Sequence, residues 1–80
     1  MLSELKIGSR VVGAKQTKRA IADGRALRVF LAMDADPRIT HPLAALCKEN
    51  HIPVEHVCTM SELGAVCNIA VGSAVAALIS

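Results

Sequence analysis

The sequence has almost no aromatic residues. Its 80 residues include no tryptophan, no tyrosine and a single phenylalanine, Phe30. RNA-recognition motifs, cold-shock domains and most proteins that bind single-stranded nucleic acid stack several aromatic rings on the bases. The scarcity of rings therefore excludes these modules. With 52% hydrophobic residues the chain is too apolar to be disordered, and its length suits one compact domain covering residues 1–80.

Signals for zinc binding and for secretion are also missing. The three cysteines, Cys47, Cys58 and Cys67, form no CxxC pair, which excludes a zinc ribbon or knuckle. Residues 1–4 lack the basic segment and following apolar stretch of a secretory signal. Reduced thiols without a signal are typical of the cytoplasm, so we expect a cytoplasmic protein.

No signature of catalysis surrounds the candidate nucleophiles. Nucleophilic catalysis needs a nucleophile, a base and an orienting group, and the chain has no nucleophile elbow, phosphate-binding loop or paired carboxylates. Cys47 and His51 are four residues apart and could share a helix face as a metal pair, but a half-buried cysteine beside a helix-end histidine is commoner. We expect no enzyme, no cofactor and no metal; a thiol- or metal-dependent enzyme is the alternative.

Charge is absent from residues 63–80, a stretch of 18 residues that reaches the minimum length of a membrane span. The stretch contains Gly64, Asn68, Gly72 and two serines, and no basic residue flanks it. This composition favours a helix end, a loop and a buried strand over a membrane anchor. We therefore expect no membrane partner.

The charges that are present are unevenly distributed. Residues 1–28 carry seven basic and two acidic residues, a net charge of +5, whereas residues 29–80 carry two basic and five acidic ones, a net charge of −3. The basic residues of the first segment are Lys6, Arg10, Lys15, Lys18, Arg19, Arg25 and Arg28. A basic third on a weakly acidic remainder suggests a surface that faces a polyanion. The same charges also fit the solvated faces of helices.

Hydrophobic periodicity predicts strands that alternate with helices. Ala14, Thr17, Ala20 and Ile21 form one apolar stripe of a helix over 14–23, which ends at Gly24. Strands are expected at 10–13, 26–33, 52–58 and 71–79. Two further helices are expected, one over 59–66 and one from the cap at Asp36 to about residue 50. We expect Pro42 to interrupt or restart the helix that Asp36 caps. Strands 26–33 and 71–79 are apolar on both faces, which is typical of central strands. The sequence thus predicts an α/β fold, a three-layer α-β-α sandwich with a four-stranded mixed sheet.

The start of the first predicted helix carries the strongest candidate site. A strand ends at Gly13, which permits close approach of another backbone, and the free N–H groups of the following turn suit a phosphate. Lys15 can donate to guanine O6 and N7, and Gln16 can both accept and donate at a base edge. Arg19, one turn further on, can hold a phosphate. A capped surface helix with three cations explains this segment equally well.

Three motifs resemble one known family. Residues 13–19, GAKQTKR, resemble the G-x-[N/K]-[E/Q]-x-x-K signature of the ribosomal protein L-seven-Ae/L-thirty-e family. The resemblance continues at 34–37, DADP, and at 63–74, LGAVCNIAVGSA, which is similar to the family's L-G-x-A-x-G-I-x-V-x-A-A loop and strand. It covers nearly the whole chain in the right order and is strongest with the short stand-alone bacterial members.

The resemblance implies an RNA-binding protein that recognises kink-turns, which are sharply bent helix–internal-loop–helix motifs with tandem sheared G·A pairs. Lys15 and Gln16 match the residues that read the guanine edges, and Ile69 and Val71 match an apolar loop that covers a flipped-out nucleotide. The residues alone fit Ile69 and Val71 equally well as core positions at a strand start. The complete predicted RNA-binding set is Gly13, Lys15, Gln16, Thr17, Lys18, Arg19, Ile69 and Val71.

Two departures from the family pattern bear on the site. Lys15 and Gln16 replace an Asn-Glu pair that is common in archaeal and eukaryotic members, and Asn68 stands where glycine is usual. The expected partners are a structured kink-turn RNA and, more loosely, the ribosome, bound by a monomer. The alternative is a ribosomal subunit held mainly by protein contacts, with a weak or vestigial RNA site.

Overall fold

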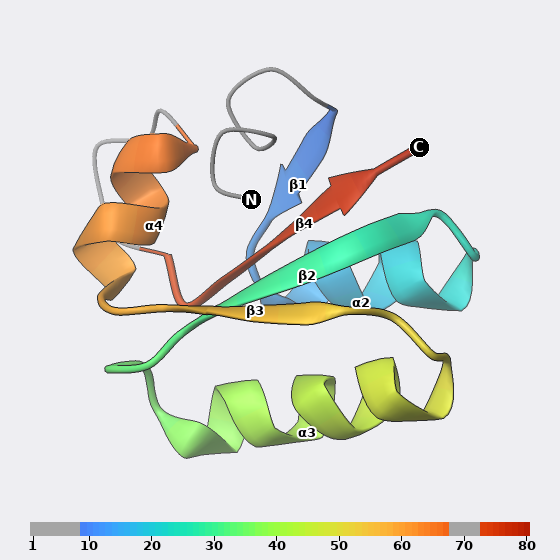
Figure 1. The fold of residues 1–80 in the computed structure, drawn as a ribbon, viewed down its shortest axis with the longest axis horizontal. Coiled ribbons are helices and arrows are strands. Elements are labelled where there is room, and N and C mark those ends of the chain that lie inside the picture. Colours follow the sequence, from blue (N-terminus) through green and yellow to red (C-terminus); the bar gives the residue numbers. More distant parts are fainter. Residues whose placement is uncertain (1–8, 68–72) are drawn as a thin grey trace.

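A computed structural model describes residues 9–67 and 73–80 (Figure 1). These residues form four strands and three helices in the predicted alternation. In chain order the elements are β1 (Arg10–Val12), α2 (Ala14–Ala22), β2 (Ala26–Ala32), α3 (Pro37–Glu49), β3 (Val54–Val57), α4 (Met60–Val66) and β4 (Val75–Ile79).

The four strands form one mixed sheet in the order β1-β4-β2-β3. β4 runs antiparallel to both β1 and β2, whereas β2 and β3 are parallel. β2 and β4 are therefore the central strands, as their apolar sequences predicted. It also follows that β1, β2 and β3 all point the same way, so their carboxyl ends lie at one edge of the sheet.

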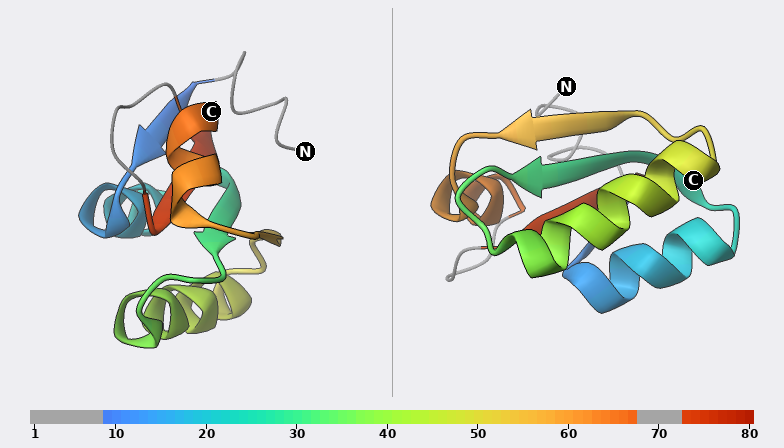
Figure 2. Two further views of the ribbon diagram at one scale, coloured as in Figure 1. Left: turned by 90° about the vertical axis from the view of Figure 1, so that its left-hand side faces the viewer. Right: turned by 90° about the horizontal axis from the view of Figure 1, so that it is seen from below.

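Helices cover both faces of this sheet (Figures 1 and 2). On one face, Val29 and Leu31 of β2 pack with buried residues of α2 and α3. On the other, Phe30 and Ala32 of β2 pack with Leu63 and the end of α4. Successive strand residues point to opposite faces, so a strand covered on both sides reads as a continuous apolar run. The predicted three-layer sandwich with a four-stranded mixed sheet is confirmed.

Side-chain caps begin two of the helices where the sequence predicted them. The carboxylate of Asp36 accepts a hydrogen bond of 2.9 Å from the backbone N–H of Arg38, at the start of α3. The hydroxyl of Thr59 accepts one of 3.0 Å from the N–H of Glu62, in α4. Asp34 caps α4 rather than α3, because its carboxylate accepts from the N–H of Met60 at 2.8 Å. This last bond ties the end of β2 to α4, which lies on the face of the sheet opposite to α2 and α3.

The prediction that Pro42 interrupts its helix is wrong. α3 is continuous from Pro37 to Glu49. An internal proline costs a helix about 3 kcal/mol because it lacks an N–H and crowds the preceding turn. Leu43 and Cys47, both buried against the sheet, are each worth about 1.5–3 kcal/mol of burial. These contacts outweigh the local penalty and hold both halves of the helix in one piece.

The charge-free segment 63–80 contributes most of α4 and all of β4 to this sandwich. Within 9–67 and 73–80, no helix is both long and apolar enough to cross a bilayer. The third strand is shorter than expected, at Val54–Val57 instead of 52–58. The last strand begins at Val75, and residue 71, where it was expected to begin, lies outside the described residues.

The thiols should differ sharply in reactivity. All three cysteines lie in the described residues; Cys58 is exposed, whereas Cys47 and Cys67 are buried. Burial raises the pKa of the Cys47 and Cys67 thiols because it disfavours their thiolates. At mildly alkaline pH, iodoacetamide should therefore label one thiol in the folded protein and all three in denaturant, which mass spectrometry would count. Rapid labelling of Cys47 in the folded protein would contradict the packing of α3 against the sheet.

Candidate nucleic-acid interface

The junction between β1 and α2 builds the candidate site. Gly13, which joins them, has a φ of 99°, a value that residues with a side chain rarely adopt. Its N–H donates to the carbonyl of Val75 at 2.9 Å, and its carbonyl accepts from the N–H of Thr17 at 3.0 Å. The glycine therefore turns the chain directly from the sheet into the helix and fixes the first turn of α2 beside the start of β4.

The amino end of α2 differs from those of the other described helices. All three helices follow strands that point the same way, so they all begin near one edge of the sheet. Acidic or hydroxyl side chains cap α3 and α4, but no side chain within residues 9–67 and 73–80 caps α2, and its first turn holds no acidic residue. The free N–H groups and the positive end of the helix dipole thus remain available to an external anion at α2.

Four of the predicted RNA-binding residues lie exposed on α2: Lys15, Gln16, Lys18 and Arg19. They occupy two flanks of the helix. Lys15 and Lys18 line a groove beside α3. Gln16 and Arg19 line a smaller hollow of about 210 Å³ beside β1. No ion pair engages Lys15, Lys18 or Arg19 within the described parts of the chain, so all three charges are free to meet a phosphate.

Thr17, which the family resemblance places next to the reading pair, faces the sheet instead of the solvent. Its side chain is 0% exposed, in the apolar stripe that the periodicity predicted. The hydroxyl oxygen has no hydrogen-bond partner among residues 9–67 and 73–80. An unpaired buried hydroxyl costs about 1–3 kcal/mol. The side chain of Thr17 can therefore act on a partner only indirectly, through the position of the helix.

Ile69 and Val71 lie outside the described residues, so their part in the site stays a prediction. Ser73, the first described residue after them, is anchored by two hydrogen bonds. The N–H of Ser73 donates to the carbonyl of Met60 at 3.0 Å, and its hydroxyl donates to the carbonyl of Val75 at 2.7 Å. The same Val75 carbonyl accepts from Gly13, so the described end of the segment lies next to the start of α2.

Sequence reasoning missed one charged group near this edge. Arg38 lies at the start of α3, and its side chain is 90% exposed. Its guanidinium donates to both carboxylate oxygens of Asp36, at 2.8 to 3.2 Å. The pairing lowers the pKa of Asp36 and raises that of Arg38. An arginine two residues after a capping aspartate was the available signal, because a capping carboxylate has oxygen lone pairs left to accept from it.

Residues 3–80 match the model of the Ribosomal protein L7Ae/L30e/S12e/Gadd45 family. The chain belongs to this family. The resemblance carried by residues 13–19, 34–37 and 63–74 is thereby confirmed. The match spans every described element, so the site at α2 lies within the family's common fold.

Several bacterial members of the family are closely similar to this chain. An RNA-binding protein of Geobacillus sp. strain WCH70 is 47% identical over 75 residues, covering 94% of this chain and 92% of the relative. The RNA-binding protein YbxF of Geobacillus stearothermophilus is 41% identical over 75 residues, which again cover 94% of this chain and 92% of the relative. An RNA-binding protein of Caldanaerobacter subterraneus is 41% identical over 68 residues, or 85% of this chain and 83% of the relative.

Solved structures share the fold. The 15.5kD RNA binding protein of Giardia lamblia superposes with a TM-score of 0.92 at 28% identity, over 99% of this chain and 70% of that protein. A protein of unknown function from Bacillus halodurans superposes with a TM-score of 0.88 at 24% identity, over 99% and 83% of the two chains. The second likeness concerns the fold alone.

Replacing Thr17 with valine tests the energetic cost of its unpaired hydroxyl. The change keeps the side-chain volume and removes the unpaired hydroxyl, so the free energy of unfolding should rise by about 1 kcal/mol. Urea denaturation measures this, with Thr17→Ser as the control that keeps the hydroxyl. A destabilised valine variant would show that the hydroxyl finds a partner in solution.

Proposed function

We propose that this protein binds structured RNA through the first turns of α2 and recognises kink-turns. One observation carries the proposal: no side chain of the described residues caps the amino end of α2, and the first turns of this helix display Lys15, Gln16, Lys18 and Arg19. The names of the bacterial relatives support it, because each is called an RNA-binding protein rather than an enzyme. Like them, we infer, this chain is not an enzyme.

In the proposed complex, α2 supplies both affinity and specificity. Lys18 and Arg19 neutralise phosphates, which a sharp bend in RNA crowds together. Lys15 donates to guanine O6 or N7, while Gln16 pairs with a neighbouring base edge through its amide. Each such side chain is worth about 1–3 kcal/mol of discrimination between bases. Ile69 and Val71 would complete the site by covering an unstacked nucleotide.

Acidic residues at the neighbouring helix starts restrict where the RNA can lie. Asp34 and Asp36 occupy the amino ends of α4 and α3, and Glu62 lies in the first turn of α4. Phosphates that approached these two ends would meet carboxylates already engaged with the free N–H groups. The RNA backbone is therefore expected to follow α2 and its two basic flanks instead of the whole edge of the sheet.

We infer a cytoplasmic monomer that forms one domain over residues 1–80 and can associate with ribosomal RNA. Aliphatic and basic side chains suffice for a folded RNA, which offers guanine edges and clustered phosphates without requiring bases to stack on rings.

A titration with two RNAs tests the specificity. The protein should bind a kink-turn RNA more tightly than the same RNA with its sheared G·A pairs replaced by Watson–Crick pairs. Lys15→Ala and Gln16→Ala should each reduce this preference by about fivefold to a hundredfold. Lys48→Ala, which removes an exposed cation from the last turn of α3, is the matched control.

Equal affinity for the two RNAs would contradict the proposed specificity. Binding to ribosomes that survives high salt, without binding to the free kink-turn, would instead support the alternative function as a protein-held ribosomal subunit.

The role of Lys18 is tested by salt. If its ammonium contacts phosphate and reads no base, Lys18→Ala should weaken both RNAs equally. It should also reduce the slope of log K against log salt concentration by about one unit. Fluorescence anisotropy at several salt concentrations measures the slope, again with Lys48→Ala as the control. A loss confined to the kink-turn RNA would make Lys18 a base-reading residue.

A further inference from the structure

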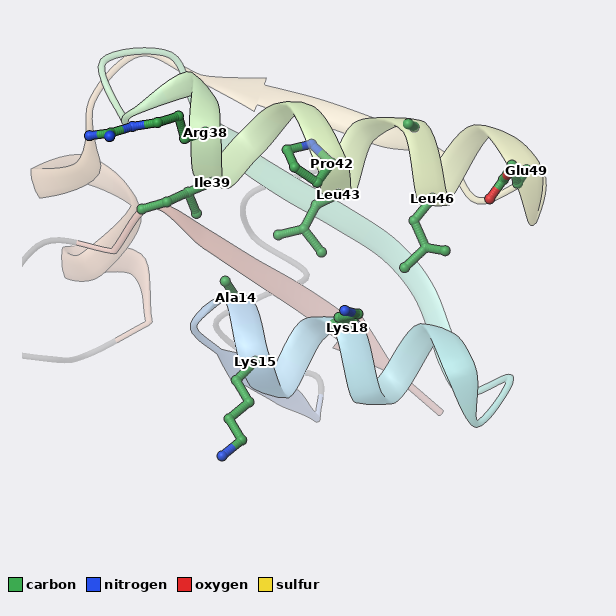
Figure 3. A pocket seen from close by; sticks show the side chains of 10 residues that line it. Ala14, Lys15, Lys18, Arg38, Ile39, Pro42, Leu43, Leu46 and Glu49 are labelled. Atoms are coloured by element: carbon green, nitrogen blue, oxygen red, sulfur yellow. The ribbon is translucent and has the colours of Figure 1, made fainter.

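A long groove separates α2 from α3 on the outer surface of the sandwich (Figure 3). Its volume is about 620 Å³. Leu43 and Leu46 point from α3 toward α2, Ile39 lies on the side of α3 that faces Ala14, and Lys15 extends from the first turn of α2 away from α3 (Figure 3). The groove is thus a feature of two neighbouring helices and reaches the first turn of α2.

The walls of the groove are mainly aliphatic. Ile39 is 40% exposed, Pro42 and Ala45 are exposed as well, and Leu46 is half-buried. Among the described residues, no ring lines the groove to stack on a base, and the only hydrogen-bonding side chains that line it are those of Lys15, Lys18, Arg38 and Glu49. Branched aliphatic side chains of a protein fit such walls better than nucleotide bases do, because bases need partners for their polar edges.

The two ends of the groove differ in electrostatic potential. α2 and α3 begin at the same end, where Lys15 and Arg38 lie, and Glu49 lies near the other end of α3 (Figure 3). Arg38 and Glu49 are eleven residues apart in α3, which corresponds to roughly 16 Å along a helix. The helix dipoles add positive potential at the first end and negative potential at the second.

We propose that this groove binds an amphipathic helix of another protein. The ridge of a helix fits between two parallel helices, and aliphatic residues at positions i, i+3 or i+4, and i+7 would fill the space above Ile39 and Leu46. The charges define its orientation. Acidic residues lie over Lys15 and Lys18, whose charges no ion pair engages within the described parts of the chain, and basic residues lie over Glu49 toward the other end of α3.

This second surface overlaps the first at Lys15 and Lys18. The acidic end of the docked helix and the phosphates of an RNA would compete for these ammonium groups. RNA binding should therefore weaken the docking, and by linkage docking should weaken RNA binding by the same factor. This competition rests on the proposed function, whereas the docking itself does not.

A synthetic helical peptide of about four turns tests the docking in the absence of RNA. It carries glutamates at one end, leucines at i, i+4 and i+7, and lysines at the other end. A second peptide keeps the same leucines but carries lysines at both ends, so that no acidic end can lie over Lys15 and Lys18. Methyl NMR should show shifts at Ile39, Leu43 and Leu46 with only one of the two peptides, because the groove is charged oppositely at its ends.

Variants locate the binding surface. Ile39→Lys and Ala45→Arg should each weaken the preferred peptide about tenfold or more, by adding charge or bulk to the groove. Leu27→Lys is the matched control, because Leu27 is also exposed, at 52%, but does not line the groove. Circular dichroism confirms that each variant remains folded.

Two results would overturn the proposal. One is equal binding, or no binding, of the two peptides. The other is an Ile39→Lys variant that binds the peptide as tightly as Leu27→Lys does but loses affinity for RNA, which would make the groove part of the RNA site. Because the peptide assay contains no RNA, failure of the docking leaves the proposed RNA binding intact.

Discussion

The structure depends on one buried pair of strands, β2 and β4. Residues 29–32 and 75–78 are buried, and the register pairs large side chains with small ones, Phe30 with Ala76 and Val29 with Ala77. Small residues on β4 leave room for the one aromatic ring and let helices approach both sides of the sheet. A chain of 80 residues has little core to spare. Close packing around this pair is therefore what holds α2 in place.

The direction of the strands determines where the amino ends of the helices, and with them the candidate site, lie. Since β1, β2 and β3 point the same way, three helices begin at one edge, and each amino end needs partners for its free N–H groups. The chain supplies those partners at α3 and α4 through Asp34, Asp36 and Thr59. In the part of the chain that the structure describes, no side chain caps α2, and cations lie there instead. One edge thus carries two satisfied helix ends and one open end.

Most of the fold, and part of the site, could be predicted from the sequence. The apolar runs gave the central strands and the capping residues gave the helix starts, because both signals are local. The apolar stripe predicted the burial of Thr17, but the continuity of α3 through Pro42 depends on contacts with distant strands, which a local pattern does not contain. The groove between α2 and α3 depends on the spacing of two helices and leaves no trace in either one alone.

The conformation of Gly13 has a consequence for chirality. A Cβ atom built at this position would meet no heavy atom within 4 Å, so the junction excludes other residues by backbone handedness and not by crowding. A D-amino acid prefers the positive φ found here, and its side chain would enter open space. The same open space adjoins the first turn of α2. An achiral residue therefore keeps the backbone unstrained and leaves room for whatever approaches the helix end.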